Sequence, residues 1–346
     1  MALFGSGDIG MDLGTSVIHI VVKGKGVVFS ESACVAFERE TRNVIAAGDR
    51  AKRMMGRTPR DMDVERPFRE PHIRSFDLVN KMVNSFVRNF IKEWKIGRPR
   101  LFLALPCGLT PTERQTIIEM MVDAGARTVV PVDESVASAI GAKIRIDQPY
   151  GRMNVDMGGA RTSIAVFSMG NQAKWRIDDF GGDRLDAAVM DYMRRKHNLI
   201  IGENTAERLK IILGAVRPFD QTLQEEVFGR SLISGLPRGL IVNSDEITEA
   251  LQPPIHDFIN VLHRFIEQTP PELASDIFDA GITLSGGSAR LYGMEEMLTE
   301  QIGMPFHVAD EPELTVARGL AELISNPDAY EKINLGSPYK EDEVID

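Results

Sequence analysis

The sequence predicts an α/β fold of two domains that share one plan. Its 346 residues suffice for about two domains of ordinary size. The chain contains two segments in which short β-branched runs alternate with glycine turns. Amphipathic helical patterns fill the stretches between and after these segments. Strands that alternate with helices in this way indicate sheets covered by helices.

The two strand-rich segments are copies of one unit. In the first segment, strands are expected at residues 9–13, 17–22 and 27–29. In the second segment, they are expected at residues 154–157, 162–167 and 173–177. An Asp-apolar-Gly-small turn follows the first strand of each segment, at Asp12-Leu13-Gly14-Thr15 and at Asp156-Met157-Gly158-Gly159. The same turn at the same place predicts a duplicated domain.

Helices are expected around these strands. Thr110-Pro111-Thr112-Glu113 has the capping-box pattern with proline at the first helical position, and Gly125 ends the helix that follows. Apolar residues recur at three- and four-residue steps over 184–196, where basic residues suit the C-terminal end. Pro253-Pro254 is expected to separate two helices. Other helical patterns cover residues 75–94, 134–143, 204–213, 245–251, 254–267, 290–302 and 313–325.

The composition excludes several classes of function. A net charge of −10 argues against binding of nucleic acid and against a polybasic surface that binds a membrane, since both need clustered positive charge. Cys34 and Cys107 lie in apolar stretches without CxxC spacing, which favours a reducing cytoplasmic compartment over a disulfide framework. No apolar run reaches the roughly 18 residues of a transmembrane helix. We therefore expect a protein that is neither secreted nor membrane-spanning.

Two common nucleotide motifs do not apply. Gly5, Gly7 and Gly10 spell GxGxxG, but no strand precedes this pattern and a strand, not a helix, follows it. The P-loop pattern GxxxxGK[ST] is absent from the sequence. A dinucleotide fold and a Walker-type site are therefore not expected.

The paired turns instead predict a phosphate site. Glycine-containing backbone after a strand lets peptide N–H groups approach an anion closely. Two such turns that face each other would clamp a phosphate chain. Asp12 and Asp156 would then supply oxygen ligands to Mg²⁺ bound to that chain, directly or through water. The alternative is two hairpins with structural glycines, which a single copy of the turn would favour.

Further stretches identify the chain as similar to a known family. Besides DLGT, they include VKGKGVV, AKRMMGRTP, DESVASAIGA, RRKHNLIIGENTAERLKI, ISGLPRGL, QTPPELASDIFDAGITLSGGSARLYG and ADEPELTVARG. In order and spacing, from about Gly10 to about Leu323, they resemble the actin, Hsp70 and sugar-kinase superfamily and, within it, the MreB family of bacterial actin homologues. The resemblance implies an actin-like fold, a ribonuclease H-like plan in duplicate, with a nucleotide cleft between two α/β domains and a small subdomain on each.

This fold implies a set of domain boundaries. Domain I is expected at residues 1–133 and 306–335, with its small subdomain at about 30–72. Domain II is expected at residues 134–305, with its small subdomain at about 178–240. The acidic stretch 336–346 lacks periodicity and is expected to be a disordered tail.

The resemblance also assigns residues to a site for ATP or ADP with Mg²⁺. Glu134 matches the family glutamate that positions the attacking water, and Asp12 and Asp156 would hold the metal. Glu207 and Lys210 match a pair that brackets the adenosine, although their spacing alone would indicate a surface ion pair. The expected nucleotide-binding residues are Asp12, Gly14, Thr15, Ser16, Asp156, Gly158, Gly159, Ala160, Arg161, Thr162, Gly182, Asp183, Glu207, Lys210, Gly286, Gly287 and Ser288.

Several positions depart from the family pattern. Val17 replaces the usual asparagine, Ala160 and Ser288 replace glycines, and Arg161 replaces a threonine whose hydroxyl is expected near the attacking water. Backbone donors survive these changes, so we expect nucleotide binding with slow ATP hydrolysis that Arg161 impairs. Alternatively, Arg161 stabilises charge on the transferring phosphoryl group. The family's apolar membrane-insertion loop is poorly matched at 93–98, where one tryptophan lies among charges.

The function implied is that of a bacterial actin-like cytoskeletal protein that polymerises into filaments and organises cell shape or cell-wall synthesis. Its expected partners are other copies of itself, the cytoplasmic face of the membrane and membrane proteins of the cell-elongation machinery, without nucleic acid. The expected location is cytoplasmic, with membrane association. Alternatives are another actin-superfamily scaffold or partition filament, and a small-metabolite kinase of the same superfamily.

Overall fold

The computed structural model describes residues 7–69, 75–94, 97–106 and 108–335. The predicted tail 336–346 and Cys107 lie outside these residues. By packing, the chain divides into two compact units. Unit 1 comprises Met1–Tyr150, Ala165–Ile177 and Leu314–Asp346, and unit 2 comprises Gly151–Ile164 and Asp178–Glu313. The domain boundaries expected from the family resemblance differ from this division, and they stay a prediction.

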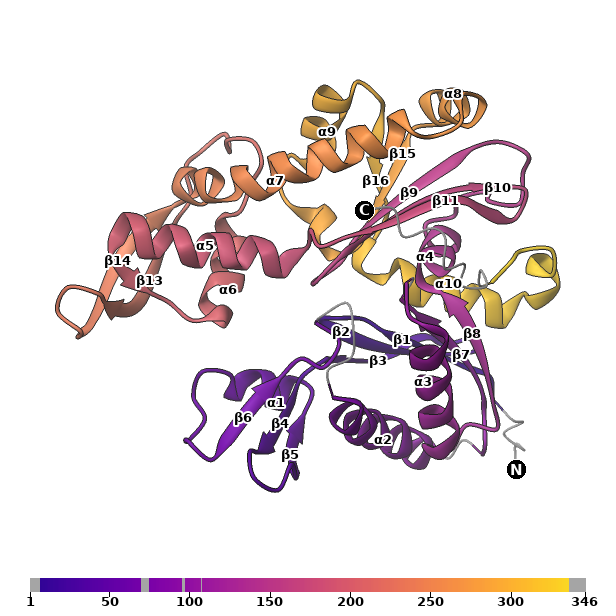
Figure 1. Cartoon of the computed structure of the whole chain (residues 1–346), viewed down its shortest axis with the longest axis horizontal. Coiled ribbons are helices and arrows are strands. Elements are labelled where there is room, and N and C mark those ends of the chain that lie inside the picture. Colours follow the sequence, from indigo (N-terminus) through magenta and orange to yellow (C-terminus); the bar gives the residue numbers. More distant parts are fainter. Residues whose placement is uncertain (1–6, 70–74, 95–96, 107, 336–346) are drawn as a thin grey trace. The chain divides into compact units, whose positions relative to one another are not determined.

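The first large sheet belongs to unit 1 and has the strand order β3-β2-β1-β7-β8 (Figure 1). β1 (Ile9–Leu13) pairs antiparallel with β2 (Val17–Val22), which pairs antiparallel with β3 (Gly26–Ser32). On its other side, β1 pairs in parallel with β7 (Arg100–Leu105), and β7 pairs in parallel with β8 (Thr128–Asp133). β1 is buried along its whole length, as expected of a central strand with both faces covered.

The second large sheet repeats this order as β11-β10-β9-β15-β16. Its strands are β9 (Arg152–Met157), β10 (Thr162–Ser168), β11 (Asn171–Asp178), β15 (Ile282–Ser285) and β16 (Phe306–Val308). β15 pairs in parallel with both β9 and β16. In each large sheet the earliest strand is central, the next two lie on one side, and two later strands lie on the other. The predicted duplication is therefore confirmed.

A small three-stranded sheet occurs in each stretch where a subdomain was expected. The order β5-β4-β6 joins β4 (Val35–Glu38), β5 (Val44–Ala47) and β6 (Met62–Glu65), with α1 (Asp49–Met54) beside them. The order β12-β13-β14 joins β12 (Leu199–Ile200), β13 (Gln224–Ser231) and β14 (Pro237–Asn243).

Most of the longer helices lie at the predicted sites, and the exception is the helix at Pro271–Ala280. They are α2 (Phe76–Glu93), α3 (Pro111–Asp123), α4 (Glu134–Gly141), α5 (Gly182–His197), α6 (Glu203–Leu213), α7 (Ser244–Glu267), α8 (Pro271–Ala280), α9 (Met294–Ile302) and α10 (Thr315–Ser325). Short 3₁₀ turns are η1 (Gly287–Arg290), η2 (Pro312–Leu314) and η3 (Pro327–Tyr330). The capping box of α3 is confirmed, because Glu113 N donates to Thr110 Oγ1 at 3.2 Å and Thr110 N donates to Glu113 Oε2 at 2.9 Å. Among the described residues, no helix is both long and apolar enough to span a membrane.

The prediction that Pro253 and Pro254 separate two helices is wrong. α7 runs through both prolines without a break. Each proline costs a helix interior about 3 kcal/mol. The helix nevertheless starts at a complete capping box of Asn243 and Glu246 and buries a long apolar face that includes Phe258. Burial of this face therefore outweighs the unfavourable effect of the two prolines on the helix.

In unit 1, α10 packs against the main sheet and against α4. A Cβ on Gly10 in β1 would lie 2.6 Å from Val21 Cγ2 and 2.9 Å from Leu320 Cβ. This glycine therefore serves strand–helix packing, in agreement with the rejection of GxGxxG as a dinucleotide fingerprint. A Cβ on Gly141 would lie 1.8 Å from Thr315 O, and a Cβ on Gly319 would lie 1.8 Å from Ala137 O. α4 and α10 thus meet backbone to backbone.

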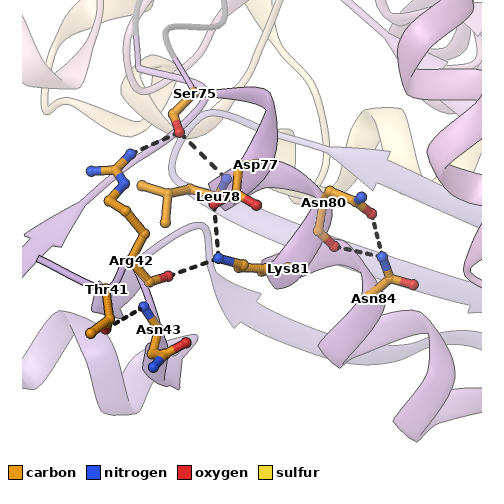
Figure 2. Close-up of polar contacts among 9 residues, drawn as sticks. All are labelled: Thr41, Arg42, Asn43, Ser75, Asp77, Leu78, Asn80, Lys81 and Asn84. Atoms are coloured by element: carbon orange, nitrogen blue, oxygen red, sulfur yellow. Dashed lines mark hydrogen bonds and ion pairs between the residues drawn. The ribbon is translucent and has the colours of Figure 1, made fainter. Parts of the chain in front are cut away.

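The turn after β4 is fastened to the start of α2, also in unit 1 (Figure 2). Arg42 Nη2 donates to Ser75 Oγ at 2.8 Å, and Lys81 Nζ donates to the carbonyl oxygen of Arg42 at 2.9 Å. The same Lys81 Nζ lies 2.9 Å from Asp77 Oδ2. Arg42 has a φ of 57°, in the left-handed region. These contacts hold the strained turn and attach the small sheet to α2.

Candidate functional site

The residues predicted to bind nucleotide fall into two groups. Unit 1 contains Asp12, Gly14, Thr15, Ser16 and Glu134. Unit 2 contains Asp156, Gly158, Gly159, Ala160, Arg161, Thr162, Gly182, Asp183, Glu207, Lys210, Gly286, Gly287 and Ser288. Most of these residues lie at or directly after the carboxyl ends of the parallel strands β1, β8, β9 and β15, the edge at which open α/β sheets bind ligands. Gly182 and Asp183 instead start α5, and Glu207 and Lys210 lie on α6.

The unit 1 group lies after β1 and β8. Asp12 is 7% exposed and stands in register with Ala104 of β7. A Cβ on Gly14 would lie 2.3 Å from the carbonyl oxygen of Val17, so the turn between β1 and β2 requires glycine there. Glu134 directly follows β8, at the same edge of the parallel strands β1, β7 and β8.

The start of α4 is anchored on both sides of Glu134. Asp133, the N-cap residue, accepts a hydrogen bond from Arg114 Nη1 at 3.1 Å. Ser135 Oγ accepts one from Gln172 Nε2 at 3.0 Å. Because both neighbours are held, the backbone that presents the half-buried Glu134 is fixed. A fixed carboxylate is what the orientation of a water molecule requires.

In unit 2, two loops meet where β9 and β15 end. Asp156 of β9 is 6% exposed and stands in register with Ser285 of β15. Gly286 has a φ of 79°, and a Cβ there would lie 2.4 Å from the carbonyl oxygen of Met157 and 2.6 Å from Asp156 Oδ1. Only glycine therefore lets the loop of Gly286, Gly287 and Ser288 approach the carboxylate of Asp156 this closely.

The turn between β9 and β10 is closed by a hydrogen bond from Gly158 N to the carbonyl oxygen of Arg161 at 3.0 Å. The start of α5 packs against this turn: Gly182 N donates to the oxygen of Gly158 at 3.1 Å, and Asp183 N donates to that of Gly159 at 2.7 Å. These N–H groups at the helix start are thus used to hold the turn. An anion at this place would have to be bound by the N–H groups of the turn itself.

Two hydroxyl groups fasten the turn further. Ser288 Oγ donates to the carbonyl oxygen of Gly158 at 2.9 Å, so the serine that replaces a family glycine bridges η1 to the turn. Thr162 is fully buried, and its Oγ1 donates to the carbonyl oxygen of Phe180 at 2.7 Å. The hydroxyl of Thr162 therefore supports the backbone that leads into α5.

Arg161 ends the same turn. Its side chain is half-buried, and its Nε is buried without a hydrogen-bond partner among the described residues. A guanidinium has five N–H donors and no acceptor. A phosphate oxygen at this turn would supply an acceptor to this group.

α6 contributes Lys210, and its partner was not predicted. Lys210 Nζ donates to the carbonyl oxygen of Gly182 at 3.1 Å and forms an ion pair with Asp186 Oδ1 at 2.9 Å. The spacing of Glu207 and Lys210 had indicated a surface ion pair, whereas the structure pairs Lys210 with the buried Asp186 of α5. Burial raises the pKa of Asp186 to about 6 against the opposing effect of Lys210. The available signal was its position three residues after Asp183, on the same helix face.

The model of the MreB/Mbl protein family matches residues 6–332. The chain belongs to the MreB/Mbl family. It is 38% identical over 325 residues to the cell shape-determining protein Mbl of Bacillus cereus, covering 94% of this chain and 98% of Mbl. It is 40% identical over 330 residues to the cell shape-determining protein MreB of Escherichia coli K12, covering 94% of this chain and 95% of MreB.

Solved structures of MreB and related proteins share the fold. MreB5 of Spiroplasma citri bound to ADP superposes with a TM-score of 0.88 at 28% identity, covering 94% of this chain and 97% of MreB5. MamK in a double helical filament gives a TM-score of 0.75 at 17% identity, covering 92% of this chain and 98% of MamK. The predicted actin-like α/β fold of this MreB/Mbl family member is therefore confirmed.

Proposed function

We propose that the chain is a cell shape-determining, actin-like cytoskeletal protein that binds ATP or ADP with Mg²⁺ and polymerises into filaments. The observation that supports this most is the convergence, within unit 2, of the Gly158–Arg161 turn, the start of α5, Ser288 and Lys210. MreB5 of Spiroplasma citri, 28% identical to this chain, was solved with ADP and with AMPPNP.

The residues of unit 2 fit a magnesium nucleotide. The turn has small residues at Gly158, Gly159 and Ala160, so a phosphate can approach its peptide N–H groups. Asp156 places a buried carboxylate at the end of β9, next to that turn. Mg²⁺ commonly takes one or two carboxylates together with phosphate oxygens and water. In the part of the chain that the structure describes, no three His, Cys, Asp or Glu residues cluster as metal ligands, so the nucleotide and water would supply most ligands.

Filament assembly completes the proposal. MamK, which shares the fold, has been solved as a double helical filament. A filament needs a heterologous, end-to-end contact, because a closed two-fold contact stops at a dimer. Bound nucleotide would bias the protomer toward the assembling conformation. The cytoplasmic face of the membrane, membrane proteins of the cell-elongation machinery and a role in cell-wall synthesis belong to this proposal as well.

The metal assignment is tested with Asp156→Ala and Asp12→Ala. We expect the wild-type protein to bind ADP more tightly with Mg²⁺ than with a chelator, and each variant to lose that gain, because a carboxylate that serves the metal is removed. Isothermal titration calorimetry measures both affinities. Asp279→Ala, at an exposed position of α8, is the matched control. A Mg²⁺-dependent gain that persists unchanged in both variants would refute the assignment.

Assembly is tested by sedimentation and negative-stain electron microscopy of the purified protein. We expect the protein to form filaments with ATP. Assembly is also measured with ADP and with a non-hydrolysable analogue, since nucleotide state is proposed to control the protomer conformation. Monomers or closed dimers in all three nucleotides would contradict the filament proposal and favour a different role for the same fold.

A further inference from the structure

A buried ion pair lies behind the start of α5 in unit 2. Asp186 is 7% exposed, and the side chain of Lys210 is 15% exposed. The carboxylate and the ammonium are 2.9 Å apart, and the same ammonium donates to the carbonyl oxygen of Gly182 at 3.1 Å. A Cβ on Gly182 would lie 3.0 Å from Lys210 Nζ, 3.5 Å from Ser288 Oγ and 3.6 Å from Gly159 O. The ion pair is therefore part of the cluster that holds the predicted phosphate turn.

The charges around Asp186 come from two helices. Its pKa is raised to about 6, first by burial, and Glu207 of α6 and Asp183 of α5 raise it further, while Lys210 lowers it. The strand β12 has no ionisable side chain. α7 meets α5 at other positions, through the pairs Arg184–Asp257, Tyr192–Glu249 and His197–Glu246.

Ionisation of this carboxylate costs the folded state stability at neutral pH. The pKa of Asp186 in the folded protein, about 6, lies above the model value of 3.8. The folded state therefore binds the proton more tightly than the unfolded state, and stability falls as the pH rises through that interval. The same carboxylate holds an ammonium that contacts the backbone of the candidate site, which makes Asp186 a candidate functional residue.

We infer that Asp186 is a positioning residue for the nucleotide, because its carboxylate holds the Lys210 ammonium beside Gly182, where the ammonium reaches a bound nucleoside. An ammonium has three N–H donors, and Gly182 and Asp186 account for two of them. Among the described residues the third has no acceptor, so it is available to a nucleoside bound beside Gly182. This inference rests on the proposed nucleotide function.

Protonation of Asp186 removes the partner of Lys210. The ammonium then gains more from moving into water than from staying beside a neutral carboxyl group. The hydrogen bond that Lys210 makes to the nucleoside is lost with it. Nucleotide affinity therefore falls as the pH is lowered through about 6, in step with the pKa of Asp186.

The test compares wild type with Asp186→Asn for binding of ADP in the presence of Mg²⁺, by calorimetry at about pH 7.5 and about pH 5. We expect the variant to bind about 10-fold more weakly at the higher pH, as for a lost hydrogen bond to a charged group. At the lower pH the two proteins should bind equally. The phosphate of ADP also titrates near pH 6, but it does so for both proteins and cancels in the ratio. Asp191→Asn, at an exposed position of the same helix, is the matched control and should follow wild type.

A double-mutant cycle with Lys210→Met shows whether Asp186 acts through Lys210. We expect Asp186→Asn to have no further effect on ADP affinity in the Lys210→Met background. In Lys210→Met alone, the affinity for ADP should also depend less on pH than it does in wild type. This variant tests the inference if Asp186→Asn does not fold. A purely structural role would lower the melting temperature and leave the pH dependence of affinity as in wild type. That result overturns the inference while the proposed function stands, whereas absence of ADP binding by the wild-type protein overturns both.

Discussion

Replacing Gly319 with alanine is expected to lower the free energy of unfolding by about 3 kcal/mol, the upper end of the usual cost of overpacking. The added Cβ would lie 1.8 Å from the carbonyl oxygen of Ala137 and 2.6 Å from its carbon. Both are backbone atoms of α4, so no side-chain rotation relieves the clash. Alanine gains about 1 kcal/mol over glycine in helix propensity, which is too little to compensate. Urea denaturation followed by circular dichroism measures the change.

The matched control for this substitution is Gly97→Ala. No described heavy atom lies within 4 Å of the position its Cβ would take, and its φ is not positive. We expect this variant to unfold within about 0.5 kcal/mol of wild type, the usual range for surface changes. If Gly319→Ala were equally neutral, α4 and α10 would not pack backbone to backbone, and the placement of Glu134 at the start of α4 would lose its support.

Local sequence patterns were sufficient where an element is bounded by clear signals. β1 and β2 have the predicted bounds, because each is an apolar run that ends at a polar or glycine turn. The capping box at Thr110 and Glu113 likewise located the start of α3. In such cases the chemistry that forms the element lies within a few residues of it.

Elements that depend on distant contacts were predicted poorly. α7 continues through Pro253 and Pro254 because its apolar face is buried by other helices, which no local pattern reveals. α8 was not predicted, and it buries only Ile277 among its side chains. Pro271 lies in its first turn, a position that favours proline, so this residue was the available signal for the start of α8.

In the candidate site, too, local patterns were predicted and contacts between distant residues were not. The turns that follow Asp12 and Asp156 were recognised because the duplication repeats them, and the structure places both after central strands. The bond from Thr162 to the backbone of Phe180 and the pairing of Lys210 with Asp186 join residues far apart in the chain. Their partners were not evident from spacing, because the spacing of Glu207 and Lys210 indicated a different pair.

Glu134→Ala is expected to slow phosphate release from ATP by about two to four orders of magnitude, the usual loss when a group that orients water or accepts its proton is removed. The carboxylate stands at the first position of α4, between two neighbours that are fixed by hydrogen bonds. Phosphate release under assembling conditions measures the rate. Glu119→Ala, at an exposed position of α3 in the same unit, is the matched control. Full turnover in Glu134→Ala would remove the glutamate from the proposed mechanism.

The same assay decides the role of Arg161, which replaces the family threonine. We expect Arg161→Thr to release phosphate faster than wild type, because the substitution restores a hydroxyl near the attacking water and removes a large cation from the turn. The structure leaves Arg161 Nε buried without a hydrogen-bond partner among the described residues. If that group binds the transferring phosphoryl group in the manner of an arginine finger, its loss slows release instead. A slower Arg161→Thr would therefore show that the arginine is catalytic, and a faster one that it restrains hydrolysis while the backbone donors of the turn still bind the nucleotide.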